Sequence, residues 1–383
     1  MKPTRNPFIH ALGLSLAACL TANAITWDGE SKSTNNWIGG SGANSGERNW
    51  DTNNAPVASN PLIFAGTTRL APNNNTAAGT SYAGITFNNT AGAFVLAGNG
   101  ITLGGDVIND DADLQTINMA MSLSATRTFN AASGNITVGG VISGSGFGII
   151  KTGSNTLSLN ASNTYTGATT IKAGTLELLA GASLASPSLI VGDTGSTGAI
   201  LDAITSGLIV ANGQTVSGIG TIKGSTTIQL GGTLAPGNSA GILTNLGNVS
   251  LQAGSNFQME INGATAGTGY DQLNVTGPTS TVTLAGLLSV TTGSTPTNGS
   301  LFFLIDNDGP SAISGTFSNA PINGNTYTFG SQQYAVSYFG DYGTTSFTGG
   351  NDVVLMAVPE PGAALIGGLG VLFLLRRRRG TTV

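Results

Sequence analysis

The sequence predicts an all-β protein with one additional element, a short C-terminal helix of the transmembrane type. Three observations support this fold class. Short apolar alternations recur roughly every 10–20 residues. Glycine makes up 58 of the 383 residues and supplies the backbone conformations that sharp turns need. No helical period extends beyond about two turns before the C-terminal tail. This pattern is typical of a β-sandwich or a β-solenoid.

The N-terminus has the parts of a secretory signal peptide in the expected order. A basic start is followed by an apolar run at residues 8–18 and by a small-x-small site at Ala22 and Ala24. We expect signal peptidase to remove residues 1–24. The mature chain would then begin at Ile25.

The side chains best suited to catalysis or metal binding lie within this signal. The single cysteine, Cys19, and the single histidine, His10, both precede the predicted cleavage point. A chain processed there has no thiolate nucleophile, imidazole base or His/Cys zinc site. We therefore predict no catalytic residue, no metal and no cofactor. Cys19 also ends a stretch similar to a lipobox, so lipidation of Cys19 is the alternative export route.

The remaining body is weakly charged and acidic. Charged residues make up 8% of the chain, against roughly 25% in typical globular proteins. Between Ile25 and Val358 there are 17 acidic and 7 basic residues, a net charge of −10 (7 − 17). An acidic exterior disfavours nucleic acid and anionic lipid as partners, and it tolerates calcium and neutral glycans.

The central part of the body contains short runs in which apolar residues alternate with polar ones. Gly or Asn separates most of these runs, as expected for strands joined by sharp turns. The expected strands are Ile136–Val138, Thr156–Leu159, Thr170–Lys172, Thr175–Leu178, Leu189–Val191, Leu208–Val210 and Thr227–Leu230.

Within the same part, glycines recur at a characteristic spacing around one lysine and an Asn-Thr-Tyr-x-Gly-x-Thr core. They are Gly144, Gly146, Lys151, Gly153, Asn163, Tyr165, Gly167, Thr169 and Gly174. This spacing resembles the autotransporter-associated β-strand repeat. The resemblance implies a right-handed parallel β-helix of the kind found in bacterial passenger domains. In such a solenoid each coil stacks ~4.8 Å from the next and buries its apolar face against its neighbours.

We divide the chain into five segments. They are the signal peptide (1–24), an N-terminal cap with the first strands (25–134), the repeat solenoid (135–256), a C-terminal β region (257–357) and a sorting signal (358–383). A β-sandwich-like arrangement is the alternative for the C-terminal β region, where aromatic residues are more frequent.

Several residues invite both a structural and a binding interpretation. Trp27, Trp37 and Trp50 fit a cap over the exposed solenoid end, and sugar stacking on exposed indoles is the alternative. Tyr165 is expected to pack beside its turn. Two acidic stretches, Asp306–Gly309 and Asp110–Asp113, could bind a cation, but we interpret both as solvated loops because neither completes a calcium-loop pattern.

The C-terminal tail combines three features in a fixed order. A Pro-Glu-Pro triplet precedes an apolar run of 14 residues, and a block of four arginines follows. As a helix, the run would measure about 21 Å, short of the ~30 Å hydrocarbon core of a bilayer. The arginines would stay on the cytoplasmic side. The residues concerned are Pro359, Glu360 and Pro361 in the triplet and Arg376, Arg377, Arg378 and Arg379 in the basic block.

This tail resembles the PEP-CTERM sorting signal of Gram-negative bacteria. The resemblance implies that an exosortase, a membrane-embedded cysteine protease or transpeptidase, recognises the triplet and processes the chain beside it. The protein would then contact the inner membrane transiently, or stay anchored there by the tail. Proteins of this class commonly occur in bacteria that make exopolysaccharide.

The sequence thus predicts an exported structural or adhesive protein of the cell surface or extracellular matrix, without enzymatic activity. Two alternatives remain at this point. One is an exopolysaccharide-binding module. The other is a polysaccharide-acting enzyme, because two carboxylates that are distant in sequence can meet in space.

Overall fold

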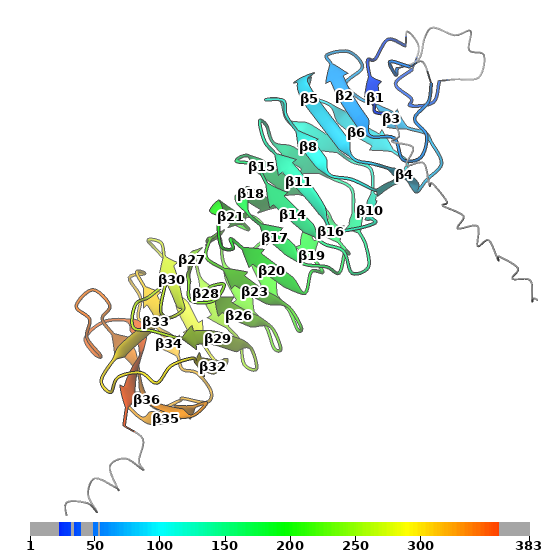
Figure 1. Ribbon diagram of the computed structural model, residues 1–383. Coiled ribbons are helices and arrows are strands. Elements are labelled where there is room, and N and C mark those ends of the chain that lie inside the picture. The colour runs from blue at the N-terminus through cyan, green and yellow to red at the C-terminus, as the bar shows by residue number, and fades with distance from the viewer. Residues whose placement is uncertain (1–22, 32–33, 40–48, 53, 360–383) are drawn as a thin grey trace, which may run out of the picture.

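The computed structural model describes residues 23–31, 34–39, 49–52 and 54–359. Figure 1 shows an elongated body in which strands stack along the long axis, with the two ends of the described chain at opposite ends of the stack. Successive strands pass in turn to three faces, so each regular coil contributes one strand to each face. The structure is an all-β parallel β-solenoid.

Two faces are long continuous sheets. The first is parallel throughout and consists of β1(Ile25–Trp27), β2(Leu62–Gly66), β5(Ile85–Ala91), β8(Val107–Asn109), β11(Arg127–Ala131), β14(Ile149–Thr152), β17(Thr169–Ile171), β20(Ser188–Val191), β23(Thr215–Gly218), β26(Thr233–Pro236), β29(Asn256–Ile261) and β32(Leu287–Thr292). The second consists of β3(Asn73–Asn74), β6(Val95–Gly98), β9(Gln115–Ile117), β12(Ile136–Val138), β15(Thr156–Leu159), β18(Ala173–Leu178), β21(Thr197–Asp202), β24(Thr221–Lys223), β27(Ile242–Leu246), β30(Gln272–Thr276), β33(Leu301–Asn307), β37(Asp352–Val358), β36(Gln332–Gly340) and β35(Thr326–Phe329).

The third face is divided into three shorter sheets. The first of them contains β4(Thr80–Tyr82), β7(Ile101–Leu103), β10(Met121–Leu123) and β13(Ile142–Ser143). The second pairs β16(Ser162–Asn163) with β19(Ser183–Leu184). The last contains β22(Leu208–Val210), β25(Thr226–Ile228), β28(Val249–Leu251), β31(Val282–Leu284) and β34(Ser314–Gly315).

The core is a set of apolar columns that run along the solenoid axis. On the second face, equivalent positions of successive coils pair directly, and the side chains in one such column are at most 1% exposed. Because side chains alternate between faces of a strand, a one-residue slip would turn the whole column outward. The column contains Ile136, Leu157, Leu176, Leu201 and Ile222.

Glycine is required where backbones of consecutive coils approach closely. A Cβ atom on Gly148 would overlap the carbonyl oxygen of Ala168 in the next coil. Gly105 has the same relation to the carbonyl oxygen of Ala83 in the preceding coil. The high glycine content therefore serves the coil spacing as well as the turns.

The strands expected from the sequence are present. Five of them match or lie within observed strands. Two are shifted: Thr170–Lys172 is observed as Thr169–Ile171, and Thr227–Leu230 as Thr226–Ile228. Alternation fixes which residues point inward, but the ends of a strand depend on pairing with neighbouring coils.

The alternative of a β-sandwich at residues 257–357 is wrong. Strands β29 to β34 continue the three faces of the solenoid. Strand β33 then pairs in parallel with β30 on one side and antiparallel with β37 on the other, and β36 and β35 extend the same sheet. In this antiparallel extension the chain stops contributing one strand per coil to each face. The extension covers the last coil, as the end of a solenoid requires.

The described structure gives no support to the C-terminal helix that the predicted fold class includes. Residues 23–31, 34–39, 49–52 and 54–359 contain no helix of any kind, and the apolar run at 362–375 lies outside them. Within the described part of the chain, no helix is long and apolar enough to cross a membrane. The described body lacks helices because its runs of a few alternating residues bury one face in a strand but cannot complete the turns that a stable helix needs.

Candidate functional site

The two predicted processing points lie directly beside the folded body. Ile25 is the first residue of β1 and is buried, and its N–H donates to the carbonyl oxygen of Pro61 at 3.1 Å. Ala24, just before it, is exposed. At the other end β37 finishes at Val358, and Pro359 follows it in an exposed position. The remaining predicted processing residues lie outside the described part: Ala22, Glu360, Pro361, Arg376, Arg377, Arg378 and Arg379.

The three tryptophans form the N-terminal end of the core. Trp27, Trp37 and Trp50 are each at most 1% exposed. The ring of Trp50 lies edge-on to Trp27 at 5.3 Å and to Trp37 at 5.7 Å, in the perpendicular geometry that aromatic pairs favour. Its Nε1 donates to the carbonyl oxygen of Trp37 at 3.1 Å. The cap interpretation is confirmed, and the sugar-stacking alternative is wrong because no indole face is exposed.

Tyr165 packs inside the solenoid, as predicted. Its side chain is fully buried, and its hydroxyl lies 2.6 Å from Oγ1 of Thr169, which is also buried. Burial raises the pKa of the Tyr165 hydroxyl. The hydroxyl therefore remains neutral and fixes the corner between the third and first faces.

Lys151 is a buried cation that the sequence did not single out as unusual. Its side chain is fully buried, and burial lowers its pKa to about 8. The Nζ donates to three main-chain carbonyl oxygens, which hold the turn between β14 and β15 against the following coil. These acceptors are Thr152 at 2.7 Å, Gly153 at 2.9 Å and Ala173 at 3.1 Å.

The acidic loop at Asp306–Gly309 is held by hydrogen bonds within the protein. The N–H of Asn307 donates to Oδ1 of Asp352 at 2.8 Å, and its Nδ2 donates to the carbonyl oxygen of Ser311 at 2.8 Å. Burial, together with the charges of Asp308 and Asp352, raises the pKa of Asp306 to about 7. Asp306 and Asn307 thus end strand β33, Asp352 begins strand β37, and Asn307 and Asp352 are buried, so the interpretation of this stretch as a solvated loop is wrong for its first two residues.

The second acidic loop is organised in the same way. Oδ1 of Asp111 accepts the N–H of Asp113 at 2.8 Å, and Oδ1 of Asn109 accepts the N–H of Asp111 at 3.0 Å. Across the described residues, no group of three or more His, Cys, Asp or Glu side chains is placed to hold a metal ion.

Asp271 is a buried carboxylate that sequence inspection missed. It is 5% exposed and accepts two main-chain N–H groups, from Gly241 at 3.0 Å and from Glu260 at 2.7 Å. Burial raises the pKa of Asp271 to about 7, although the two hydrogen bonds from main-chain N–H groups act to lower it. No local motif marks this role, because its hydrogen-bond partners lie 30 and 11 positions away.

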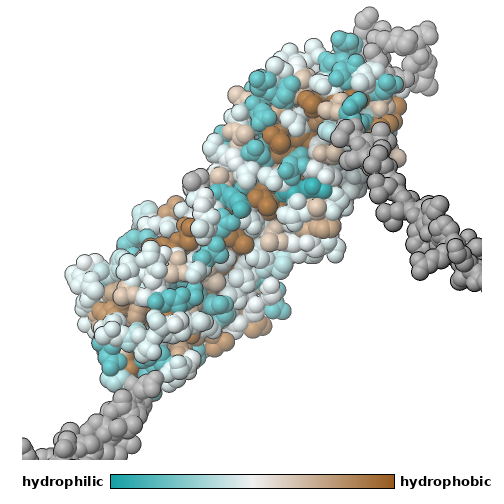
Figure 2. Space-filling view, in the orientation of Figure 1, coloured by the Kyte–Doolittle hydropathy of each residue, from teal (hydrophilic) through white to brown (hydrophobic). Residues whose placement is uncertain are grey.

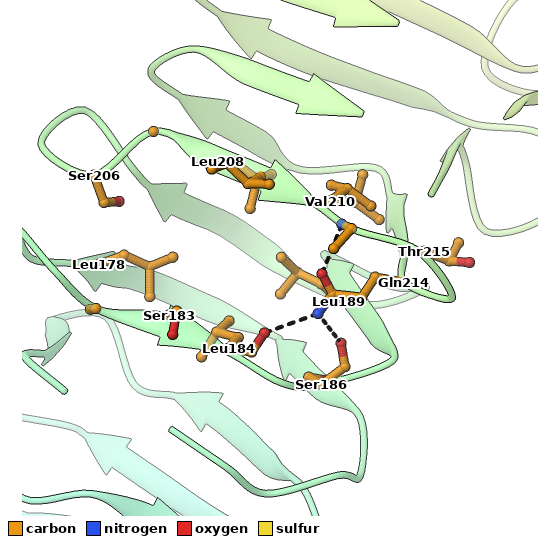
Figure 3. A pocket seen from close by; sticks show the side chains of 15 residues that line it. Leu178, Ser183, Leu184, Ser186, Leu189, Ser206, Leu208, Val210, Gln214 and Thr215 are labelled. Carbon is orange, nitrogen blue, oxygen red and sulfur yellow. Dashed lines mark hydrogen bonds between the residues drawn. The ribbon is translucent and has the colours of Figure 1, made fainter. Parts of the chain in front are cut away.

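A pocket opens on the third face between β19 and β22. The cavity measures about 310 Å³ and has no charged side chain in its lining. Figure 3 shows leucine and valine side chains from both coils directed into the space between the two strands. The main apolar contributors are Leu178, Leu184, Leu189, Leu208, Val210 and Val216.

Two polar side chains mark the ends of this pocket. Gln214 Nε2 donates to the carbonyl oxygens of Leu184 and Ser186, each at 2.9 Å, and its Oε1 accepts the N–H of Ala211 at 2.9 Å. At the opposite end, the hydroxyl oxygen of Ser206 is buried and has no hydrogen-bond partner (Figure 3). One end is therefore closed by a satisfied amide, whereas the other carries an unsatisfied hydroxyl.

The visible outer surface mixes polar and apolar residues. In Figure 2 hydrophobic residues lie in small separate patches among hydrophilic and intermediate ones along the body. Scattered apolar residues are normal on folded proteins. This face therefore does not mark one extended apolar docking surface.

Comparison with known proteins supports the passenger-type nature of the repeat. The family described as Passenger-associated-transport-repeat matches residues 149–178, which extend from β14 through β18. The chain is also 33% identical over 120 residues to an extracellular serine protease of Serratia marcescens. This match covers 31% of the chain and spans only 9% of the length of that protein. A passenger-type repeat within a parallel β-solenoid indicates an exported surface protein, and the protease activity in the relative's name is stated of that relative.

Proposed function

We propose that this protein is an exported structural or adhesive solenoid of the cell surface or extracellular matrix, trimmed at both ends. One observation carries this proposal: the first strand begins at Ile25 and the last strand ends at Val358. The folded body therefore fills the interval between the predicted signal-peptidase site and the Pro-Glu-Pro triplet.

This placement lets both processing enzymes act without unfolding the solenoid. Ala24 and Pro359 are exposed, whereas Ile25 is already part of the first sheet. Proteases act on segments that are accessible and free of regular pairing. Signal peptidase and an exosortase are accordingly the proposed processing partners, with the triplet Pro359, Glu360 and Pro361 as the recognition site.

A structural role accounts for the chemistry of the body. Most of the interior consists of apolar side chains. The carboxylates of Asp271 and Asp352 each accept two main-chain N–H groups. The chain has one histidine, His10, in the predicted signal peptide. A processed chain would lack the imidazole base of a Ser-His-Asp protease, so we propose that the protease activity of the relative does not extend to this chain.

The proposed processing is tested by following the C-terminus of the secreted product. The full chain is expressed in a host with an exosortase and in the same host lacking that enzyme, and the released protein is examined by mass spectrometry. We expect the mature N-terminus at Ile25 and loss of the tail beside the triplet, in the exosortase strain only. Glu360→Ala should retain the tail, and Glu30→Ala, at an exposed position in the body, should be processed normally.

Two outcomes would contradict this function. Normal trimming of the Glu360→Ala chain would mean that the triplet is not the recognition site. Recovery of the full-length protein in the cytosol would contradict export itself.

Exopolysaccharide binding remains a second candidate because two aromatic side chains are exposed near the C-terminal end. Phe339 is 48% exposed and Tyr342 is 40% exposed. Aromatic faces of this kind can stack on sugars. Co-sedimentation with purified exopolysaccharide should weaken in Phe339→Ala if this candidate is correct, and unchanged co-sedimentation would remove its support.

A further inference from the structure

The third face is interrupted between two consecutive coils. Strand β19 pairs with β16, and β22 pairs with β25, but β19 and β22 belong to different sheets. The other two faces continue through the same coils, by the pairing of β20 with β23 and of β18 with β21. The interruption is therefore local to one face.

The interruption coincides with a longer coil. Ser188 pairs with Thr215, 27 positions further along (215 − 188), whereas Thr169 pairs with Leu189 after only 20 positions (189 − 169). Most of the additional length lies between β20 and β21, where Leu189 and Ile200 are 11 positions apart (200 − 189), whereas their partners Thr169 and Thr175 are only 6 apart (175 − 169). The chain also turns before β22, where the N–H of Gly207 donates to the carbonyl oxygen of Ala203 at 2.7 Å. This turn places Ser206 at the edge of the opening.

The strand edge of β22 faces the opening. The N–H of Leu208 donates to the carbonyl oxygen of Ser225, and the carbonyl oxygen of Val210 accepts the N–H of Gln229. Both residues therefore direct their main-chain groups toward β25. Main-chain groups of successive residues point to opposite sides of a parallel strand. Those of Ile209 therefore face β19, across the pocket.

The pocket has the size and lining of a small-molecule site. Its volume of about 310 Å³ lies at the lower end of the roughly 300–1,000 Å³ that such sites occupy. At roughly 30 Å³ per molecule, it would hold about ten waters, but its mostly apolar walls offer them few partners. The buried hydroxyl of Ser206 lacks the partner that a buried polar group normally has.

We propose that this pocket binds a neutral, largely apolar small molecule whose single hydrogen-bonding group pairs with Ser206. No charged side chain lines the pocket, so an ionised ligand would lose its hydration without gaining an ion pair. An extended peptide is a poorer occupant because Gln214 already uses the carbonyl oxygens of Leu184 and Ser186, which an added strand would need. The site goes beyond the structural role proposed above and does not depend on how the termini are processed.

The test uses N-phenylnaphthylamine, a neutral fluorescent probe with an apolar ring system and one N–H group. Titration of the purified full chain should give a saturable fluorescence increase with one probe per chain, and octanol should displace the probe. Ala182→Phe fills the pocket from its wall and should weaken probe binding by roughly tenfold or more. Ser206→Ala should weaken it by about two- to tenfold, the range expected for one hydrogen bond.

The matched control is Ala161→Phe. Ala161 occupies the register position of Ala182 one coil earlier, because Ser162 pairs with Ser183, and it does not line the pocket. The control should bind the probe as the unsubstituted chain does. The absence of saturable binding by the unsubstituted chain would overturn the proposal. So would equal binding by Ala182→Phe, or equal weakening in Ala161→Phe.

Thermal unfolding of each variant shows whether it is folded before the titration. Should Ala182→Phe fail to fold, Ser206→Ala still decides the assignment, because it removes only one oxygen atom. Unchanged affinity in Ser206→Ala would then contradict the proposed contact between the ligand and the hydroxyl.

Discussion

The side-chain amide of Gln214 donates to the main-chain carbonyl oxygen of Leu184 at 2.9 Å, across the point where the third face is interrupted. This contact joins two coils whose strands do not pair there. The same amide nitrogen also bonds Ser186, and the amide oxygen accepts the N–H of Ala211. One side chain therefore replaces part of a missing strand ladder.

Gln214→Ala should destabilise the protein because it leaves two carbonyl oxygens and one N–H without their partner. Unpaired buried groups cost about 1–3 kcal/mol each, and partial access to water at the pocket should hold the loss of unfolding free energy to about 2–3 kcal/mol. Urea denaturation measures this loss. Gln229→Ala on the neighbouring coil is the control and should stay within about 0.5 kcal/mol of the unsubstituted chain. Equal effects of the two substitutions would show that Gln214 has no special role at the interruption.

Trp50→Ala should open the N-terminal end of the core. Removal of a fully buried ring costs about 3–5 kcal/mol, since the neighbouring rings of Trp27 and Trp37 cannot close the space. Trp50→Phe keeps an aromatic ring but loses the hydrogen bond from Nε1 and part of the packing, so its loss of unfolding free energy should be smaller than that of Trp50→Ala. Near-ultraviolet circular dichroism and urea denaturation report both changes. A stability loss below about 1 kcal/mol in Trp50→Ala would contradict the cap.

Lys151→Met should reduce stability by about 1–3 kcal/mol because three carbonyl oxygens at the turn lose a common donor. The control is Lys172→Met. The Lys172 side chain is 48% exposed, and its Nζ lies 3.4 Å from Oδ2 of Asp193. An exposed pair of this kind contributes about 0–1 kcal/mol. Chemical denaturation of the two variants should therefore separate them, and a larger effect at Lys172 would contradict the structural role of Lys151.

Stability should fall as the pH rises from 4 to 7. The pKa of Asp271 in the folded protein is raised to about 7, above the usual value near 3.8, chiefly by burial. In this interval the folded state binds a proton that the unfolded state has released, so increasing pH favours unfolding. Asp306, whose pKa is also raised to about 7, acts in the same direction. Thermal melts between pH 4 and pH 8 should show the midpoint decreasing, with most of the loss complete above pH 7.

The variants Asp271→Asn and Asp306→Asn should each flatten this pH dependence, because each removes one of the two carboxyl groups whose pKa is raised to about 7. At pH 4 Asp271→Asn should also lower stability, since an amide nitrogen cannot accept the N–H that the second carboxyl oxygen accepts. Asp110→Asn, on an exposed loop, is the control. A melting temperature that rises between pH 4 and pH 7 in the unsubstituted chain would contradict the raised pKa values.

The sequence allowed strong predictions where structure depends on nearby residues. The alternation at Ile136–Val138 and Thr156–Leu159 marks two strands at their observed bounds. The repeat spacing around Tyr165 identified a coil that the family comparison also matches. Local reasoning failed for the C-terminal β region, where the frequent aromatic residues suggested a sandwich but belong to the last coils and the antiparallel extension of the second sheet.

The candidate site was far less predictable. Ser206 and Gln214 belong to no motif, and both resemble ordinary polar residues of turns. Their significance comes from a coil that is longer than its neighbour, and the extra residues are recognisable only once the strand partners are known. The three tryptophans were correctly assigned to a cap, but their burial became certain only from the ring contacts.

By itself, the sequence determined that the body consists of short β-strands joined by glycine-rich turns, because alternation and turn conformation are local properties of the chain. Only the tertiary structure decided which strands pair, where the third face opens, and which carboxylates are buried. These features arise from contacts such as that between Gln214 and Leu184, 30 positions apart. The free energy of such contacts depends on how coils stack in space, and no short segment of the sequence contains that information.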